Sequence, residues 1–184
     1  MAVITKRRGG RVVVVLATAA YLTGLGVLGA PSGNASWSAS CNGRLAQDFD
    51  GSHSKGPLII VGSDEDDVII GSRHDDSING GEGDDLICGG GGADDIHGDE
   101  GADAIFGEDG DDTLSGDNGP DLLSGGRGND DMNGGEGADQ LFGDKGHDIL
   151  NGVDVGVAED KLKGGDGKNV CFVDAADDPD DCRY

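Results

Sequence analysis

Aspartate recurs at the sixth place of a nine-residue unit that begins at Gly62. Ten units follow one another without a gap as far as Asn151, and two more, the first with an insertion, continue to Phe172. The candidate metal ligands at this place are Asp67, Asp76, Asp85, Asp94, Asp103, Asp112, Asp121, Asp130, Asp139, Asp148, Asp160 and Asn169. A regular series of carboxylates without matching basic residues indicates a chain that binds cations.

Calcium is the cation that this chemistry favours. Carboxylates and the carbonyl oxygens of flexible glycine turns form an oxygen-only ligand set, which suits Ca²⁺. Mg²⁺ fits less well because it requires tighter octahedral geometry. Zinc would use histidine or cysteine, and His53, His74, His97 and His147 share no ligand spacing. We therefore expect several calcium ions and histidines that face solvent.

The unit Gly80–Cys88 shows which elements must hold these ligands. Its glycines at places one, two and four allow positive φ, so the first six residues are predicted to form a turn. Its last three residues are predicted to form a short strand with Ile87 pointing inward. Two units then complete a coil, which predicts an all-β, right-handed parallel β-roll with 18 residues per coil and two short parallel sheets.

Stacking of these coils explains the second fixed position, which is apolar and lies two places after the aspartate. Its residues are Ile69, Ile78, Ile87, Ile96, Ile105, Leu114, Leu123, Met132, Leu141, Leu150, Leu162 and Cys171. We expect them to fill the thin interior, because no coil can bury its apolar residue alone. Stacking also aligns the acids along both edges, where repulsion of about 1–4 kcal/mol per pair requires a cation between the turns.

The units resemble the hemolysin-type (RTX) calcium-binding repeat, written Gly-Gly-x-Gly-x-Asp-x-U-x with U a large aliphatic residue. The resemblance covers residues 62–172 and implies a β-roll whose turns bind Ca²⁺ between units n and n+2. By position, the place-six side chain would be a ligand, and places one, three and five would add backbone oxygens. Glu65, His74 and Asn169 depart from the pattern, which implies weak sites at both ends. The best sites are expected between Asp85 and Asp148, with about eight ions at most.

Charge and the N-terminal sequence indicate a secreted protein. Residues 1–35 combine four basic residues with an apolar stretch and are predicted to be an export signal, with cleavage near Gly33 and Ala35. A membrane anchor is the alternative reading of the apolar stretch, and a lipid anchor at Cys41 is a weaker one. Without the signal, nine basic residues face 37 acidic ones, so nucleic acid and anionic membranes are expected to be repelled.

The remaining chain divides into three parts. Residues 36–61 are expected to form an N-terminal cap, 62–172 the repeat roll, and 173–184 an acidic C-terminal tail. Four cysteines in an exported chain suggest two disulfides with three possible connectivities. We favour Cys171–Cys182, which would fold the tail over the end of the roll, together with Cys41–Cys88. A buried or free thiol at Cys88 is the alternative.

The two outer faces of the predicted roll differ. One is apolar and includes Val68, Ile70, Leu86, Phe106, Leu122 and Phe142, whereas the other is polar. The apolar face needs a cover, which could be segment 41–60, a second copy or another protein. No His-Glu-x-x-His or Gly-x-Ser-x-Gly motif is present, so no enzyme activity is expected. The expected function is a calcium-responsive extracellular binding or adhesion module, with a self-assembling structural or surface-associated protein as the alternative.

Overall fold

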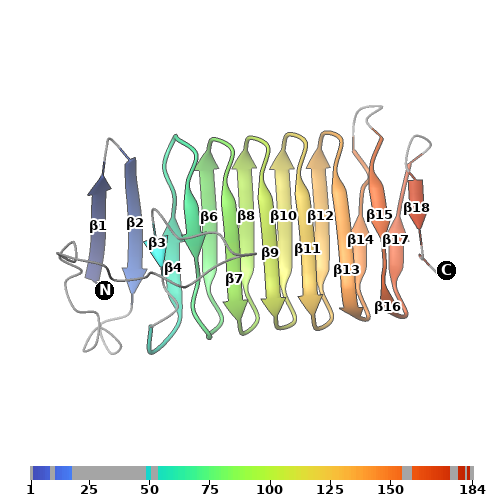
Figure 1. The fold of residues 1–184 in the computed structure, drawn as a ribbon, viewed down its shortest axis with the longest axis horizontal. Helices are drawn as coiled ribbons and strands as arrows, with labels where there is room; N and C mark the ends of the chain where they lie inside the picture. Colours follow the sequence, from blue (N-terminus) through green and yellow to red (C-terminus); the bar gives the residue numbers. More distant parts are fainter. Residues whose placement is uncertain are drawn as a thin grey trace, which may run out of the picture.

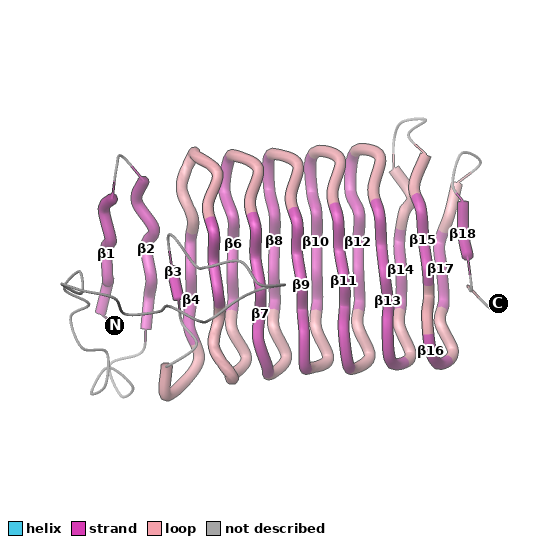
Figure 2. Tube along the Cα trace, in the orientation of Figure 1, coloured by secondary structure: helices cyan, strands magenta, loops and turns pink. Residues whose placement is uncertain are grey.

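The computed structural model describes residues 2–8, 11–17, 49–50, 54–154, 159–174, 178–180 and 182. Within these ranges every regular element is a β-strand (Figures 1 and 2). Among the residues described, no helix is long and apolar enough to span a membrane. The predicted cleavage positions Gly33 and Ala35, and also Cys41 and His53, lie outside the described residues.

The strands alternate along the chain between two nine-stranded sheets, which we call sheet A and sheet B. In spatial order, sheet A contains β1 (Ala2–Arg8), β2 (Arg11–Ala17), β4 (Leu58–Val61), β6 (Ser77–Glu82), β8 (Asp95–Glu100), β10 (Thr113–Asn118), β12 (Asp131–Glu136), β14 (Ile149–Asn151) and β17 (Val170–Phe172). Sheet B contains β18 (Asp178–Asp180), β15 (Lys161–Lys163), β13 (Gln140–Gly146), β11 (Leu122–Arg127), β9 (Ala104–Asp109), β7 (Leu86–Gly91), β5 (Val68–Ile70) and β3 (Phe49–Asp50), with β16 (Asp166–Gly167) paired to β13.

The register confirms the predicted coil. Leu114 pairs with Ile96 on one side and with Met132 on the other, so the central strands of the repeat are hydrogen-bonded in parallel to the strand 18 residues away. Between Gln140 and Lys161 the offset becomes 21 residues, which places the insertion outside the ladder. Because neighbouring coils stay in phase on both sides of the insertion, the predicted all-β, parallel β-solenoid is confirmed.

The strands are longer than the sequence predicts. Most central strands have six residues and include places one to three of the next unit, which we assigned to the turn. In β6 and β8, for example, the ladder continues through the pairs Gly81–Asp99 and Glu82–Glu100. The chain turns sharply at place two without leaving the ladder, because Gly81 adopts a φ of 113°. The turn proper is therefore confined to places four to six.

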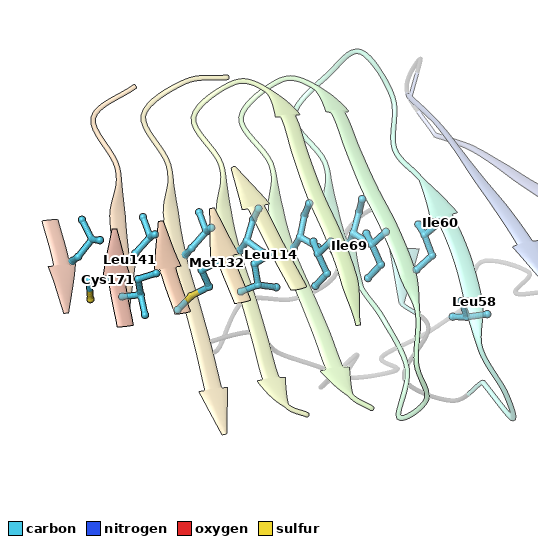
Figure 3. Packing of buried hydrophobic residues seen from close by; sticks show 14 residues of the cluster. Leu58, Ile60, Ile69, Leu114, Met132, Leu141 and Cys171 are labelled. Carbon is cyan, nitrogen blue, oxygen red and sulfur yellow. The ribbon is translucent and has the colours of Figure 1, made fainter. Parts of the chain in front are cut away.

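The apolar column fills the space between the two sheets (Figure 3). Ile69, Ile87, Ile105 and Leu123 are completely buried, and the core continues to Cys171 at the C-terminal end. Leu58 and Ile60 of β4 join the same core half a coil before the first aspartate, Asp67. The stacked side chains hold the opposite sheets at a fixed separation, which sets the width of the turns.

Both ends of the roll carry additional structure. At the N-terminal end, β1 and β2 form an antiparallel hairpin that extends sheet A, with Val14 paired to Val61 of β4. At the C-terminal end, Cys171 and Cys182 have disulfide geometry, with Cα atoms 5.7 Å apart, and Cys182 packs against the core. Cys88 is also disulfide-bonded, whereas its predicted partner Cys41 is not among the described residues.

Candidate calcium sites

The repeated turns place the predicted ligands in two separate rows, one along each edge of the roll. All twelve side chains are buried: Asp67, Asp76, Asp85, Asp94, Asp103, Asp112, Asp121, Asp130, Asp139, Asp148, Asp160 and Asn169. From Asp85 to Asn169, one side-chain oxygen accepts a hydrogen bond from the backbone N–H of the place-six residue in the preceding coil. Asp103 Oδ1 accepts from Asp85 N at 2.8 Å, and Asp121 Oδ1 accepts from Asp103 N at 2.8 Å. This bond fixes the carboxylate plane and directs the other oxygen into the turn.

The other oxygen has no hydrogen-bond donor in most of the roll. Within the described part of the chain, Oδ2 is buried without a hydrogen-bond partner in Asp85, Asp94, Asp103, Asp112, Asp121, Asp130, Asp139 and Asp148. A buried polar atom without a partner costs about 1–3 kcal/mol, and more if the group is charged. A structure that repeats this cost in consecutive units requires a proton or a cation at each of these oxygens.

The glycine at place one leaves room for that cation. A Cβ added at Gly80 would overlap Asp85 Oδ2, and it would also approach the carbonyl oxygen of Gly98 in the next coil. The same pair of oxygens surrounds Gly98, namely Asp103 Oδ2 and the Gly116 carbonyl oxygen. Each turn therefore brings a carboxylate oxygen and a backbone carbonyl oxygen together around a position without a side chain. An oxygen cradle of this kind suits Ca²⁺.

Neutral donors satisfy the aspartate oxygens at the N-terminal end of the series. Ser63 donates to Asp67 Oδ2 through its backbone N–H and its hydroxyl, at 2.8 and 2.9 Å. Ser72 donates its backbone N–H to Asp76 Oδ2 at 2.6 Å and its hydroxyl to Asp76 Oδ1 at 3.1 Å. These serines stand at place two, where most later units have glycine or an acid, so the first two turns are held by hydrogen bonds.

At the C-terminal end, the side-chain amide of Asn169 takes the place of a carboxylate and forms neutral hydrogen bonds. Asn169 Oδ1 accepts from Asp148 N at 2.9 Å, and its Nδ2 donates to the carbonyl oxygen of Gly165 at 3.3 Å. The amide thus supplies a donor where an aspartate in the other units presents a bare oxygen. The eight Oδ2 atoms from Asp85 to Asp148 lie between these two ends of the series.

Burial raises the pKa of these carboxyl groups. It raises the pKa of Asp94 to about 8 and those of Asp85 and Asp121 to about 7, and the charges of neighbouring aspartates add to the shift. It raises the pKa of Asp103 and Asp112 to about 6, although a backbone N–H on each carboxylate opposes the change. In the absence of a cation, these side chains therefore hold protons that a free aspartate would have lost.

A second row of hydrogen bonds, which the sequence analysis missed, supports each turn at place five. Asp66 Oδ1 accepts from Asp84 N at 3.1 Å, and Asp84 Oδ1 accepts from Ala102 N at 2.9 Å. On the other edge Asp111 Oδ1 accepts from Asn129 N at 2.7 Å. One pair of residues in the sequence indicates this row. Ala102 stands at place five and has no side-chain acceptor, and the residue 18 positions later is Pro120, which has no N–H to donate.

The fold and the donor set define a calcium-binding β-roll. The family model of the RTX calcium-binding nonapeptide repeat (4 copies) matches residues 59–87, 88–123 and 115–150, which together cover half of the chain. The chain therefore belongs to the family of RTX calcium-binding repeat proteins, as its sequence pattern suggests. A search of curated proteins finds no match to it.

Proposed function

We propose that this protein is a secreted β-roll that folds when it binds Ca²⁺ and then acts as an extracellular binding or adhesion module. The observation that carries the proposal is the row of unsatisfied Oδ2 atoms from Asp85 to Asp148, between ends that neutral donors stabilise. A cation at these oxygens would remove both the lost hydrogen bonds and the repulsion along each row. Binding free energy then becomes folding free energy.

The proposed ligands are the place-six residues from Asp67 to Asn169, with the carbonyl oxygens of the place-one glycines completing each site. The strongest sites are those of the eight aspartates from Asp85 to Asp148, so the expected content is about eight ions at most. Asp76 and Asn169 already have neutral partners, and we expect weak binding or none there. Extracellular sites of this kind bind with dissociation constants of roughly 10⁻⁴–10⁻³ M.

The chain's own division supports export. Residues 1–35 would be removed as a signal, 36–61 would cap the roll of 62–172, and 173–184 would cover its other end. The disulfide geometry of Cys171 and Cys182 fits an oxidising compartment. Outside the cell the protein would meet the calcium that its cytoplasmic precursor lacks. The roll has repeated turns in place of a dedicated reaction site, so we propose no catalytic role.

Coupled folding is tested by far-ultraviolet circular dichroism of the chain without residues 1–35. In excess chelator at pH 8 we expect a coil-like, expanded chain, because the protons that neutralise the carboxyl rows are lost between about pH 6 and 8. Millimolar Ca²⁺ should restore the β signal and compact the molecule. The same β signal in chelator and in calcium would contradict the proposed mechanism.

Sheet B supplies the surface on which a partner would bind. Its outward-facing Ile70, Leu86 and Cys88 are buried, so this part of the apolar face is covered within the molecule. Leu122 and Phe142, further along the sheet, are only partly buried. Phe142 lines an open groove together with the basic Arg127, Lys145 and Lys163. The acidic Glu108, Asp109, Asp144 and Asp166 line the same groove, so it combines an apolar residue with charges of both signs.

The occupant of this groove distinguishes the two candidate functions. A binding module would hold a partner protein there, whereas a self-assembling structural protein would hold a second copy of itself. Phe142→Ser should reduce capture of a partner from culture supernatant in calcium, or should reduce the sedimenting oligomer if the chain self-associates. Phe172→Ser, on the exposed outer side of sheet A, is the matched control and should change neither. Equal behaviour of both variants and the unmodified chain would remove sheet B as the interaction surface.

A further inference from the structure

Sheet A brings one histidine together with several carboxylates, two of which directly follow the place-one glycines Gly98 and Gly116. His97 stands at place nine on β8, and its Nδ1 lies 2.9 Å from Asp117 Oδ2 on β10. Its Nε2 lies 3.6 Å from Asp95 Oδ1. Ligand atoms of His97, Asp99 and Asp117 all lie within 4.8 Å of one another. One imidazole therefore shares a small area with two carboxylates, and a third carboxylate lies beside it.

Neutral neighbours hold the two carboxylates in place. Asn79 Nδ2 donates to Asp99 Oδ2 at 2.6 Å, and the hydroxyl of the buried Ser115 donates to Asp117 Oδ1 at 2.8 Å. Each bond occupies one oxygen of its carboxylate, and the other oxygen of Asp117 is the one that lies beside His97 Nδ1. Second-layer hydrogen bonds of this kind orient the ligands of metal sites.

We propose that His97, Asp99 and Asp117 form a surface site for a zinc-class divalent cation, chemically separate from the calcium turns. A ring nitrogen beside carboxylate oxygens is a donor set of zinc and its neighbours, whereas Ca²⁺ takes oxygen ligands only. Around a tetrahedral ion with bonds of about 2.0–2.2 Å, two ligand atoms stand about 3.3–3.5 Å apart. The present 2.9 Å between His97 Nδ1 and Asp117 Oδ2 needs only a small side-chain shift to reach that separation.

The chain itself supplies variants that should remove this site without harming the roll. At place two, Asp99 and Asp117 have φ values of 77° and 69°, and the corresponding residues Gly81 and Gly135 are glycines. Asp117→Gly therefore introduces the residue that favours this conformation. His97→Asn introduces the residue that occupies place nine in Asn79, its neighbour in the sheet. Both variants should keep the calcium-induced circular dichroism signal.

The test is a titration with Zn²⁺ by calorimetry, and with Co²⁺ by visible absorption, in saturating Ca²⁺ so that the turns are occupied. The unmodified chain should bind one ion with a tetrahedral Co²⁺ spectrum. His97→Asn and Asp117→Gly should each weaken Zn²⁺ binding at least tenfold, in the range that loss of a metal-site group produces. The control Asp131→Asn, an exposed acid on the same face, should leave the affinity unchanged.

Two results would overturn the proposal. The first is the absence of Zn²⁺ binding by the calcium-loaded chain. The second is equal binding by all variants, which would assign the ion to the turn aspartates. Because calcium-induced folding is measured on the same samples, loss of this site can be told apart from failure of the proposed calcium mechanism.

Discussion

At the scale of single residues, each turn combines an aspartate with one bare oxygen and a glycine whose missing side chain keeps that oxygen accessible. Asp112 Oδ2 is buried without a partner among the described residues, and a Cβ at Gly107 would overlap it and approach the carbonyl oxygen of Gly125. The glycine is therefore required by the space around the oxygens, since Gly107 is not among the positive-φ residues. At the N-terminal end the donors of Ser72 take over the role that we assign to the ion.

Substitution of that glycine tests whether the space matters. Gly107→Ala should lower the free energy of unfolding in calcium by about 1–3 kcal/mol, as overpacking does, and should raise the calcium concentration needed for folding. Gly91→Ala is the matched control, because its Cβ would meet nothing closer than the Asp109 carbonyl oxygen at 3.5 Å. Calcium titrations followed by circular dichroism measure both variants, and identical folding midpoints would contradict the cradle that we describe.

At the scale of elements, the carboxyl groups in the two rows along the edges stay protonated to a higher pH than free aspartates when no cation is bound. Burial raises the pKa of Asp94 to about 8 and those of Asp103 and Asp112 to about 6, from 3.8 for a free side chain. A carboxyl whose pKa is raised in the folded state stabilises that state below its unfolded pKa. This contribution is lost as the pH rises through the folded-state value.

The calcium-free roll should therefore be most stable near or below pH 4 and should lose that stability between about pH 6 and 8. Because Ca²⁺ and protons compete for the same oxygens, calcium binding should release protons. The calcium concentration at the midpoint of folding should therefore rise as the pH falls from 8 to 6. Circular dichroism in chelator and in calcium across this range measures both effects. A calcium midpoint independent of pH, with no structure gained in chelator at pH 4, would contradict this picture.

The sequence predicts the elements that depend on period and misses those that depend on individual contacts. The 18-residue coil and the column from Ile69 to Cys171 follow from spacing, because parallel stacking forces equivalent residues into register. The strands are longer than predicted because glycine at place two bends the chain within the ladder. The hydrogen bonds from serine to Asp67 and Asp76 depend on side-chain rotamers. The contact of His97 with Asp117 joins two different units. Composition and period do not encode such contacts.

At the scale of the whole molecule, the roll is a stack of coils, and we propose that it resists unfolding only while the carboxyl rows along its edges are neutralised. The core is one residue per unit, so each coil depends on its neighbours for burial. At the N-terminal end β4 adds Leu58 and Ile60 to this core, and at the C-terminal end Cys182 packs against it beside Cys171. We propose that the eight unsatisfied oxygens from Asp85 to Asp148 make the middle section depend on the cation.

The most direct test of this account is a crystal structure of the chain without residues 1–35, grown in millimolar Ca²⁺. We predict an ion in the turns between Asp85 and Asp148, with Asp Oδ2 and the glycine carbonyl oxygen of the next coil as ligands at about 2.3–2.6 Å. No ion is expected beside Asp76, where Ser72 already donates to both carboxylate oxygens. Turns from Asp85 to Asp148 that contain no ion in saturating calcium, in a roll that is nevertheless folded, would contradict the account.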